Sequence, residues 1–115
     1  MSLVIISQAQ GRVPVTVFHV QERIHLANFG ELEKTVKEAY DGGMRELVLD
    51  LSQAVSLSSI GIRAIVVIHK MLSAGGGRHL KIAAPTPHIR EVLEVAGVSQ
   101  YIEIYDTLDE AVASF

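Results

Sequence analysis

The sequence contains no cysteine, and only 5% of its residues are aromatic. The lack of cysteine excludes disulfide bonds, thiolate metal ligands and cysteine nucleophiles, which fits a cytosolic protein. So few aromatic side chains argue against a surface on which nucleic-acid bases stack. Basic clusters are also missing, and the net charge is −3. Direct binding to DNA or RNA is therefore not expected, because neutralising phosphates requires grouped lysine and arginine.

Long apolar runs are missing as well. None approaches the roughly 20 residues that span a bilayer, and the first residues lack the basic segment of a signal peptide. We therefore expect a soluble cytoplasmic protein that does not enter a membrane. The 115 residues, 49% of them hydrophobic, suffice for one core but not for two domains of ordinary size. We expect one domain over residues 1–115, without a cofactor, and no metal site, because the five histidines lack paired metal-ligand spacing.

One stretch in the middle of the chain is expected to organise the fold. Leu47 to Leu51 is a nearly continuous apolar run, as in a strand that is covered on both faces, and Asp50 marks its exit. Ser58 or Ser59 then begins a helix whose apolar residues recur at helical spacing. The middle of this helix is predicted to be buried. Its start, which carries two hydroxyl groups, is therefore the part most open to solvent or to a partner.

The rest of the chain alternates apolar segments with turn signals. We predict further strands or extended segments at residues 3–6, 13–20, 23–26, 80–84 and 101–105. We predict further helices at residues 28–40, 86–97 and from 107, with start signals at Asn28 and Glu31, Thr86 and Pro87, and Thr107 and Glu110. A hairpin followed by alternating strands and helices indicates an α/β fold with a mixed central sheet and about four helices packed against it.

The two serines at the strand-to-helix turn allow three interpretations. Serine commonly caps a helix, and Ser58 and Ser59 need do no more than that. A hydrolase nucleophile elbow would need glycine two positions before the nucleophile, where Leu57 precedes Ser59. The third interpretation is phosphorylation, because a phosphate at a helix N-terminus meets free N–H groups and the positive end of the helix dipole. A partner docked through Ile60 or Ile62 would not tolerate desolvation of that dianion.

The sequence resembles the STAS domain family, and within it the single-domain bacterial anti-sigma factor antagonists. The family pattern is an apolar strand ending in Asp-Leu-Ser, a short apolar stretch, and then Asp-Ser-Ser/Thr-Gly-Leu/Ile-Gly at the start of a helix. Asp50-Leu51-Ser52 aligns without a gap to Gly61-Ile62, which places Ser59 on the family's phosphorylated serine. Residues 23–25, 28–32, 85–97 and 107–111 resemble other family segments, so nearly the whole chain is covered.

The resemblance implies a binding protein without catalysis of its own. Such a protein captures an anti-sigma factor, usually a serine kinase, and so frees a sigma factor in a partner-switching pathway. Phosphorylation by the kinase releases the complex, and a separate phosphatase resets it. On this interpretation Ser59 is the phosphorylation site. The implied partner-binding residues are His25, Asn28, Ser58, Ser59, Ile60, Gly61 and Ile62.

Three positions depart from the family pattern. Ser58 replaces the aspartate before the acceptor, Ile60 replaces the serine or threonine after it, and His25 replaces an aspartate of an earlier loop. We expect these departures to weaken the serine switch. Two alternative functions remain open: a STAS scaffold subunit that is not phosphorylated, and a small serine-dependent enzyme or ligand-binding module that uses Ser59 and His25.

Overall fold

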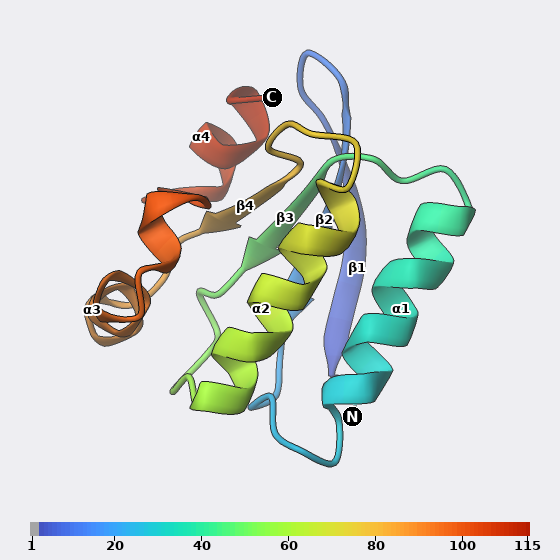
Figure 1. The fold of residues 1–115 in the computed structure, drawn as a ribbon. Helices are drawn as coiled ribbons and strands as arrows, with labels where there is room; N and C mark the ends of the chain where they lie inside the picture. Colours follow the sequence, from blue (N-terminus) through green and yellow to red (C-terminus); the bar gives the residue numbers. More distant parts are fainter. Residues whose placement is uncertain (1–2) are drawn as a thin grey trace.

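The computed structural model describes residues 3–115, which form a five-stranded sheet with helices on both faces (Figure 1). The strands are β1 (Val4–Gln10), β2 (Pro14–Val20), β3 (Leu47–Asp50), β4 (Leu80–Ala83) and β5 (Glu103–Tyr105). In this part of the chain the α-helices are α1 (Phe29–Asp41), α2 (Ser59–Leu72), α3 (Pro87–Val95) and α4 (Leu108–Ala113), with a short 3-10 helix η1 (Val98–Gln100). The predicted α/β fold with a mixed sheet and four helices is confirmed.

The strands lie in the order in which they occur in the chain. β1 runs antiparallel to β2, and β2, β3, β4 and β5 run parallel to one another. β1 extends beyond the predicted residues 3–6, because its pairing with β2 continues as far as Gln10 opposite Pro14. All four residues of the central strand β3 are buried, as its apolar run predicts.

The two faces of the sheet are covered by different helices (Figure 1). On one face α1, α2 and α3 pack over the larger core, which includes Phe18, Leu49, Ile82, Leu32, Ile65 and Leu93. On the other face α4 packs over a smaller cluster, which includes Val17, Val48, Ala83, Ala111 and Val112. Within residues 3–115, no helix is both long enough and apolar enough to cross a membrane.

Two predictions about strands need correction. Residues 23–26 are not a strand: the chain leaves the sheet after Val20, and the Arg23 carbonyl and His25 N–H groups bond to the Asn28 side chain and not to a neighbouring strand. The strand predicted at 101–105 begins only at Glu103. Gly97 adopts a left-handed conformation with φ of 79°, and the chain then turns through η1 before it enters the sheet.

Candidate functional site

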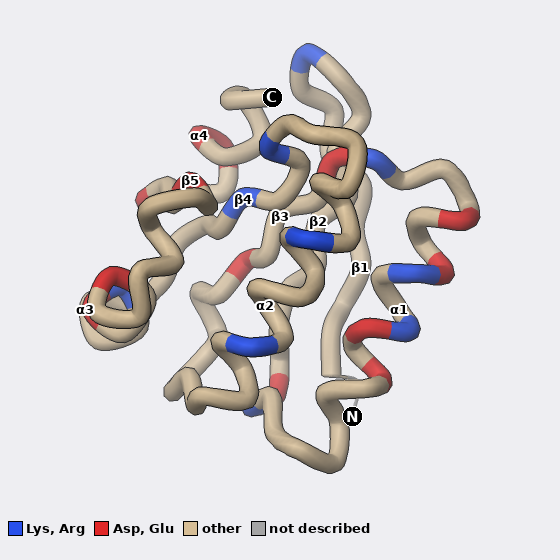
Figure 2. Tube along the Cα trace, in the orientation of Figure 1, with Lys and Arg blue, Asp and Glu red and all other residues tan. Residues whose placement is uncertain are grey.

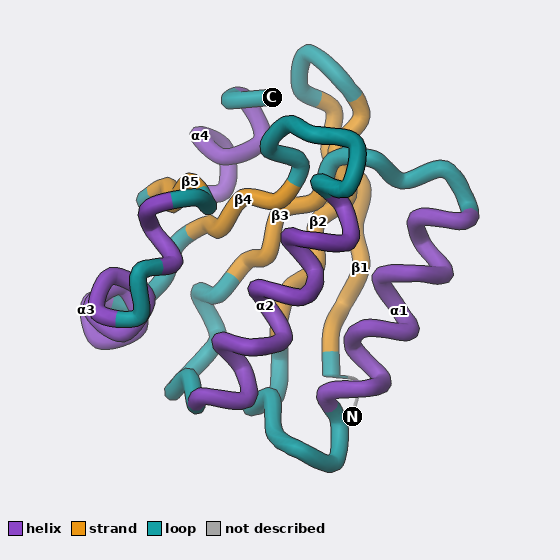
Figure 3. Tube along the Cα trace, viewed as in Figure 1, coloured by secondary structure: helices purple, strands orange, loops and turns teal. Residues whose placement is uncertain are grey.

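Helix α2 begins at one end of the molecule, between two connecting loops (Figure 3). Ser58 is the residue that caps it: its Oγ accepts a hydrogen bond from the Gly61 N–H at 3.3 Å. The same hydroxyl donates to the carbonyl oxygen of Ile24 at 3.1 Å, so it also fastens the loop before α1 to the start of α2. Ser59 is the first helical residue, and it is exposed. The predicted start of the helix is thus confirmed, with the two serines in different roles.

Asn28 does not form the predicted capping box with Glu31, and that prediction is wrong. Its side chain caps no amide of α1 and is only 7% exposed. Instead its Oδ1 accepts from the His25 N–H at 2.8 Å, and its Nδ2 donates to the Arg23 carbonyl oxygen at 2.9 Å. A buried amide that satisfies two backbone groups of one loop fixes the shape of that loop. Asn28 therefore holds the backbone of His25 in place through this hydrogen bond.

Removing this amide should destabilise the protein. We expect Asn28→Ala to lower the free energy of unfolding by about 1–3 kcal/mol, because two backbone groups lose the hydrogen bonds of a buried amide. Urea denaturation of the two proteins measures the difference. Gln53→Ala is the matched control, since that amide is exposed. A loss no greater than the control's would contradict the role assigned to Asn28.

The other predicted site residues surround the start of α2. Ile60 and Ile62 are half-buried. Gly61 is buried, and a Cβ there would lie 2.6 Å from Leu57 Cδ1, so the glycine lets Leu57 pack against the helix. His25 is exposed, and its Nδ1 accepts from the Ala27 N–H at 3.1 Å. In residues 3–115 no hydrogen bond joins His25 to Ser59, so the pair does not form a nucleophile and base.

Two exposed apolar side chains at this end were missed by the sequence analysis. Leu26 lies in the loop between β2 and α1 and is 78% exposed, and Val55 lies in the loop between β3 and α2 and is 89% exposed. Residues 51–58 carry no charge, whereas the charged residues of α1 line that helix (Figure 2). Isolated apolar residues in loops follow no periodicity, so no sequence signal marks them as exposed.

A shallow apolar groove runs between α2 and α3. It has a volume of about 300 Å³ and is lined by Ile62, His88, Glu91, Val92, Val95 and Ala96. Val95 is 84% exposed. The groove reaches the first turn of α2 through Ile62.

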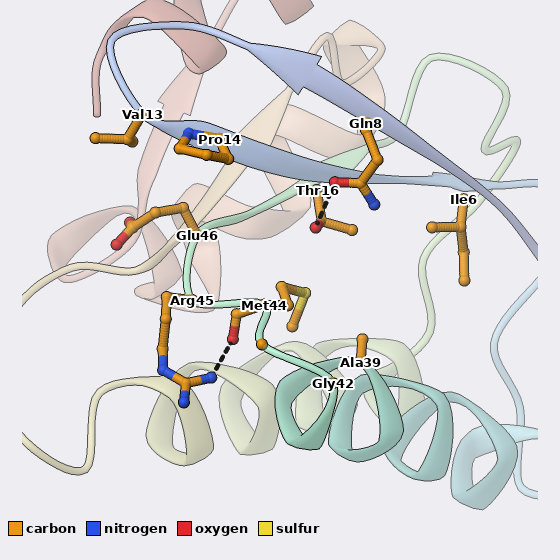
Figure 4. Close-up of a pocket in the computed structure, with 11 residues that line it drawn as sticks. Ile6, Gln8, Val13, Pro14, Thr16, Ala39, Gly42, Met44, Arg45 and Glu46 are labelled. Carbon is orange, nitrogen blue, oxygen red and sulfur yellow. Dashed lines mark hydrogen bonds between the residues drawn. The ribbon is translucent and has the colours of Figure 1, made fainter.

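A larger cavity, of about 680 Å³, lies elsewhere in the molecule. The strands β1 and β2 form one wall with Ile6, Gln8 and Thr16, and the segment after α1 forms the other with Met44 and Arg45 (Figure 4). Arg45 is held there by hydrogen bonds to the carbonyl oxygens of Tyr40 and Met44. None of the predicted site residues lines this cavity. Among residues 3–115 no cluster of three histidine or acidic side chains could hold a metal ion.

Comparison with known proteins places this architecture in a family. The sequence model of the STAS domain matches residues 6–111. BtrV of Bordetella bronchiseptica, a candidate anti-sigma factor antagonist, is 31% identical over 96 residues, which cover 84% of this chain and 82% of BtrV.

Solved structures agree with this assignment. The crystal structure of a candidate anti-sigma factor antagonist from Thermotoga maritima superposes with a TM-score of 0.79 at 26% identity, covering 87% of this chain and 86% of that chain. Phosphorylated SpoIIAA, the Bacillus cell fate determinant, shares the fold with a TM-score of 0.71 at 15% identity, covering 96% of this chain and 97% of that chain. The chain belongs to the STAS domain family and is, by distant homology, a candidate anti-sigma factor antagonist, a non-enzymatic class.

Proposed function

We propose that this protein binds a serine-kinase anti-sigma factor at the start of α2 and thereby releases a sigma factor. The observation that carries the proposal is an exposed serine at a helix N-terminus whose two flanking loops each carry an exposed apolar side chain, Leu26 and Val55. We define the docking surface as Leu26, Val55, Ser59, Ile62 and Val95. Exposed apolar side chains that lie together on one surface are typical of protein–protein interaction sites.

The absence of charge from one of the two loops favours docking there. Burying a charged group without a partner costs far more than burying an apolar or hydroxyl group. The loop that carries Val55 has no charged residue, so little charge has to be desolvated there. The loop that carries Leu26 is tied to the start of α2 by the hydrogen bond from Ser58 to Ile24, which holds its backbone in place and lowers the entropy cost of binding.

Control of this complex by phosphorylation of Ser59 is the second part of the proposal. Ser59 is exposed and its hydroxyl makes no hydrogen bond within residues 3–115, so a kinase can reach it without unfolding the helix. A phosphate there would lie at the positive end of the α2 dipole. Arg63 is also exposed and lies four residues further on, on the same helix face. The free protein would thus accept the dianion, while a docked partner would have to desolvate it.

Binding measurements test the docking surface. A pull-down from the source cell, with identification by mass spectrometry, should recover an anti-sigma factor, and titration calorimetry then gives its Kd. We expect Leu26→Ser with Val55→Ser to weaken binding more than about tenfold, because each buried apolar side chain contributes about 1.5–3 kcal/mol. Recovery of STAS relatives in place of an anti-sigma factor would favour the scaffold alternative.

The matched control is Ile6→Ser. Ile6 is 48% exposed, but it lies on β1 and lines the larger cavity, away from the docking surface. Its replacement should leave the Kd unchanged. Equal binding by the double variant and the native protein would contradict the proposed surface.

A further inference from the structure

Three polar side chains lie in a row on the face of the sheet that α4 covers, which we call the second face. They come from the neighbouring strands β1, β2 and β3. Ser7 Oγ is 2.8 Å from His19 Nε2, and His19 Nδ1 is 2.7 Å from Asp50 Oδ2. The strand register brings them together. Asp50 pairs directly with His19, and Ser7 pairs with Val17, two residues before His19 on the same face. Such diagonal neighbours are within reach of a long side chain such as histidine.

The order of these groups assigns a role to each. The Asp50 carboxylate accepts the Nδ1–H of His19, which leaves Nε2 as an acceptor for the Ser7 O–H. Asp50 is itself oriented, because its other oxygen accepts from the Ser52 N–H at 3.0 Å. Burial raises the pKa of Asp50, but the hydrogen bonds from Ser52 and His19 outweigh it and keep the pKa below its ordinary value. The chain of contacts is that of a nucleophile, a base and an orienting acid.

This row is open to a small reagent. Ser7 is half-buried, and the His19 side chain is 25% exposed. Helix α4 packs over Val15, Val17 and Val48 on the same face. Ile5, on the same face of β1, is 53% exposed, so the face is not fully covered near Ser7. A short acyl group would rest against this apolar side chain.

We propose that Ser7 is a site of covalent acyl modification. Its Oγ attacks the carbonyl carbon of an activated acyl ester, and the hydroxyl proton passes to His19 Nε2. The bond between that carbon and the leaving-group oxygen breaks, and His19 returns the proton to the departing alcohol. The product is one acyl ester on Ser7. The site is open and offers a substrate little binding energy. We therefore expect one acyl group per Ser7 and slow release of that group, not rapid turnover.

The native chain contains an internal reference for this reactivity. Ser73 Oγ lies 3.5 Å from His69 Nδ1, so it has a neighbouring histidine at longer distance. No carboxylate is hydrogen-bonded to His69 in the described part of the chain, so nothing orients this ring as Asp50 orients His19. Desolvation, Arg78 and Lys70 lower the pKa of His69, which makes it a weaker base. Ser73 should therefore react as an ordinary hydroxyl.

The test uses 4-nitrophenyl acetate as the acyl donor, with intact-mass spectrometry and peptide mapping of the full chain. Hydroxylamine treatment separates a serine ester, which it cleaves, from acetylated lysine. We expect Ser7 to be acetylated at least about tenfold faster than Ser73, because a positioned general base commonly contributes about 100-fold or more. His19→Gln and Asp50→Asn should each slow acetylation of Ser7, and urea should abolish the difference between the two serines.

Acetylation of Ser7 at the rate of Ser73 in the native protein would overturn the proposal. So would ester formation that His19→Gln leaves unchanged while circular dichroism shows the variant folded. The comparison of the two serines needs no variant, so it decides the matter even if His19→Gln fails to fold.

Discussion

Glutamate in place of Ser59 should weaken binding of the anti-sigma factor by at least about tenfold, whereas alanine should leave the Kd nearly unchanged. A difference of about tenfold corresponds to about 1.4 kcal/mol, which is less than the cost of desolvating a carboxylate at an interface. The Ser59 hydroxyl makes no hydrogen bond within residues 3–115, so alanine removes no contact from the free protein. The expected effect thus depends on charge and not on the loss of serine.

The free protein should respond to the same substitution in the opposite direction. Ser59 is the first residue of α2, where a negative charge interacts favourably with the helix dipole. The introduced carboxylate would also lie four residues before Arg63, the favourable order for an ion pair on a helix. The thermal midpoint of Ser59→Glu should therefore equal or exceed that of the native protein. Weak binding by this variant could then not be attributed to unfolding.

Ser59→Gln is the matched control for size. Glutamine has nearly the shape of glutamate without its charge, so we expect a Kd between those of the alanine and glutamate variants and nearer to alanine. Titration calorimetry of the three variants against the same anti-sigma factor makes the comparison. If glutamine weakens binding as much as glutamate, crowding and not charge governs this position, and a phosphate switch there loses its physical basis.

The elements around this site could be predicted because their signals are local. The apolar run of β3 and the helical spacing of α2 each extend over consecutive residues, and both elements occur where they were expected. The separate roles of Ser58 and Ser59 could not be assigned in the same way. Ser58 is the cap because its hydroxyl also reaches Ile24, 34 positions earlier in the chain, and no local pattern reports such a contact.

Asn28 illustrates how tertiary structure overrides a local motif. Asparagine followed three residues later by glutamate is a common start signal of a helix, and α1 does begin at Phe29. The amide nevertheless turns back to the loop that precedes it, because the backbone groups of Arg23 and His25 are there to be satisfied. The position of the helix was thus predicted correctly from an interaction that does not form.

The contacts on the second face depend on strand register, which the sequence does not specify directly. His19 follows Val15 and Val17 at every second position of β2, so it lies on their face of the sheet. Its neighbours Ser7 and Asp50 are 12 and 31 positions away. They meet it only because β1 and β3 flank β2 with one particular register.

Phosphorylation of the native protein by the serine kinase should be slow and incomplete. We expect His25→Asp combined with Ser58→Asp to increase the yield, because a kinase that docks on the acidic residues of the family pattern finds neither of them here. Without that aspartate a phosphate on Ser59 meets no neighbouring like charge, so a phosphate that is added should disturb the docking surface less. Intact-mass spectrometry after the same incubation with kinase and ATP compares the two proteins.

The structure adds a cost that this double variant must overcome. An aspartate at position 58 can still accept the Gly61 N–H, but it cannot donate to Ile24 as the serine hydroxyl does. A carboxylate facing a carbonyl oxygen is repelled, so the loop before α1 should loosen from the helix. Ser58→Asn is the control, because its amide can both cap the helix and donate. A gain in phosphorylation with aspartate but not with asparagine would assign the effect to charge.

The outcome for the native protein also separates the two binding functions. If the native protein is phosphorylated slowly and the double variant faster, the kinase recognises this surface. The departures at His25 and Ser58 then set the efficiency of phosphorylation. Modification that neither variant improves, together with capture of STAS relatives, would favour a scaffold subunit. Rapid and complete phosphorylation of Ser59 in the native protein would contradict the prediction. The hydroxyl of Ser58 would then suffice at the start of α2, because it holds the acceptor serine exposed as the first residue of a capped helix.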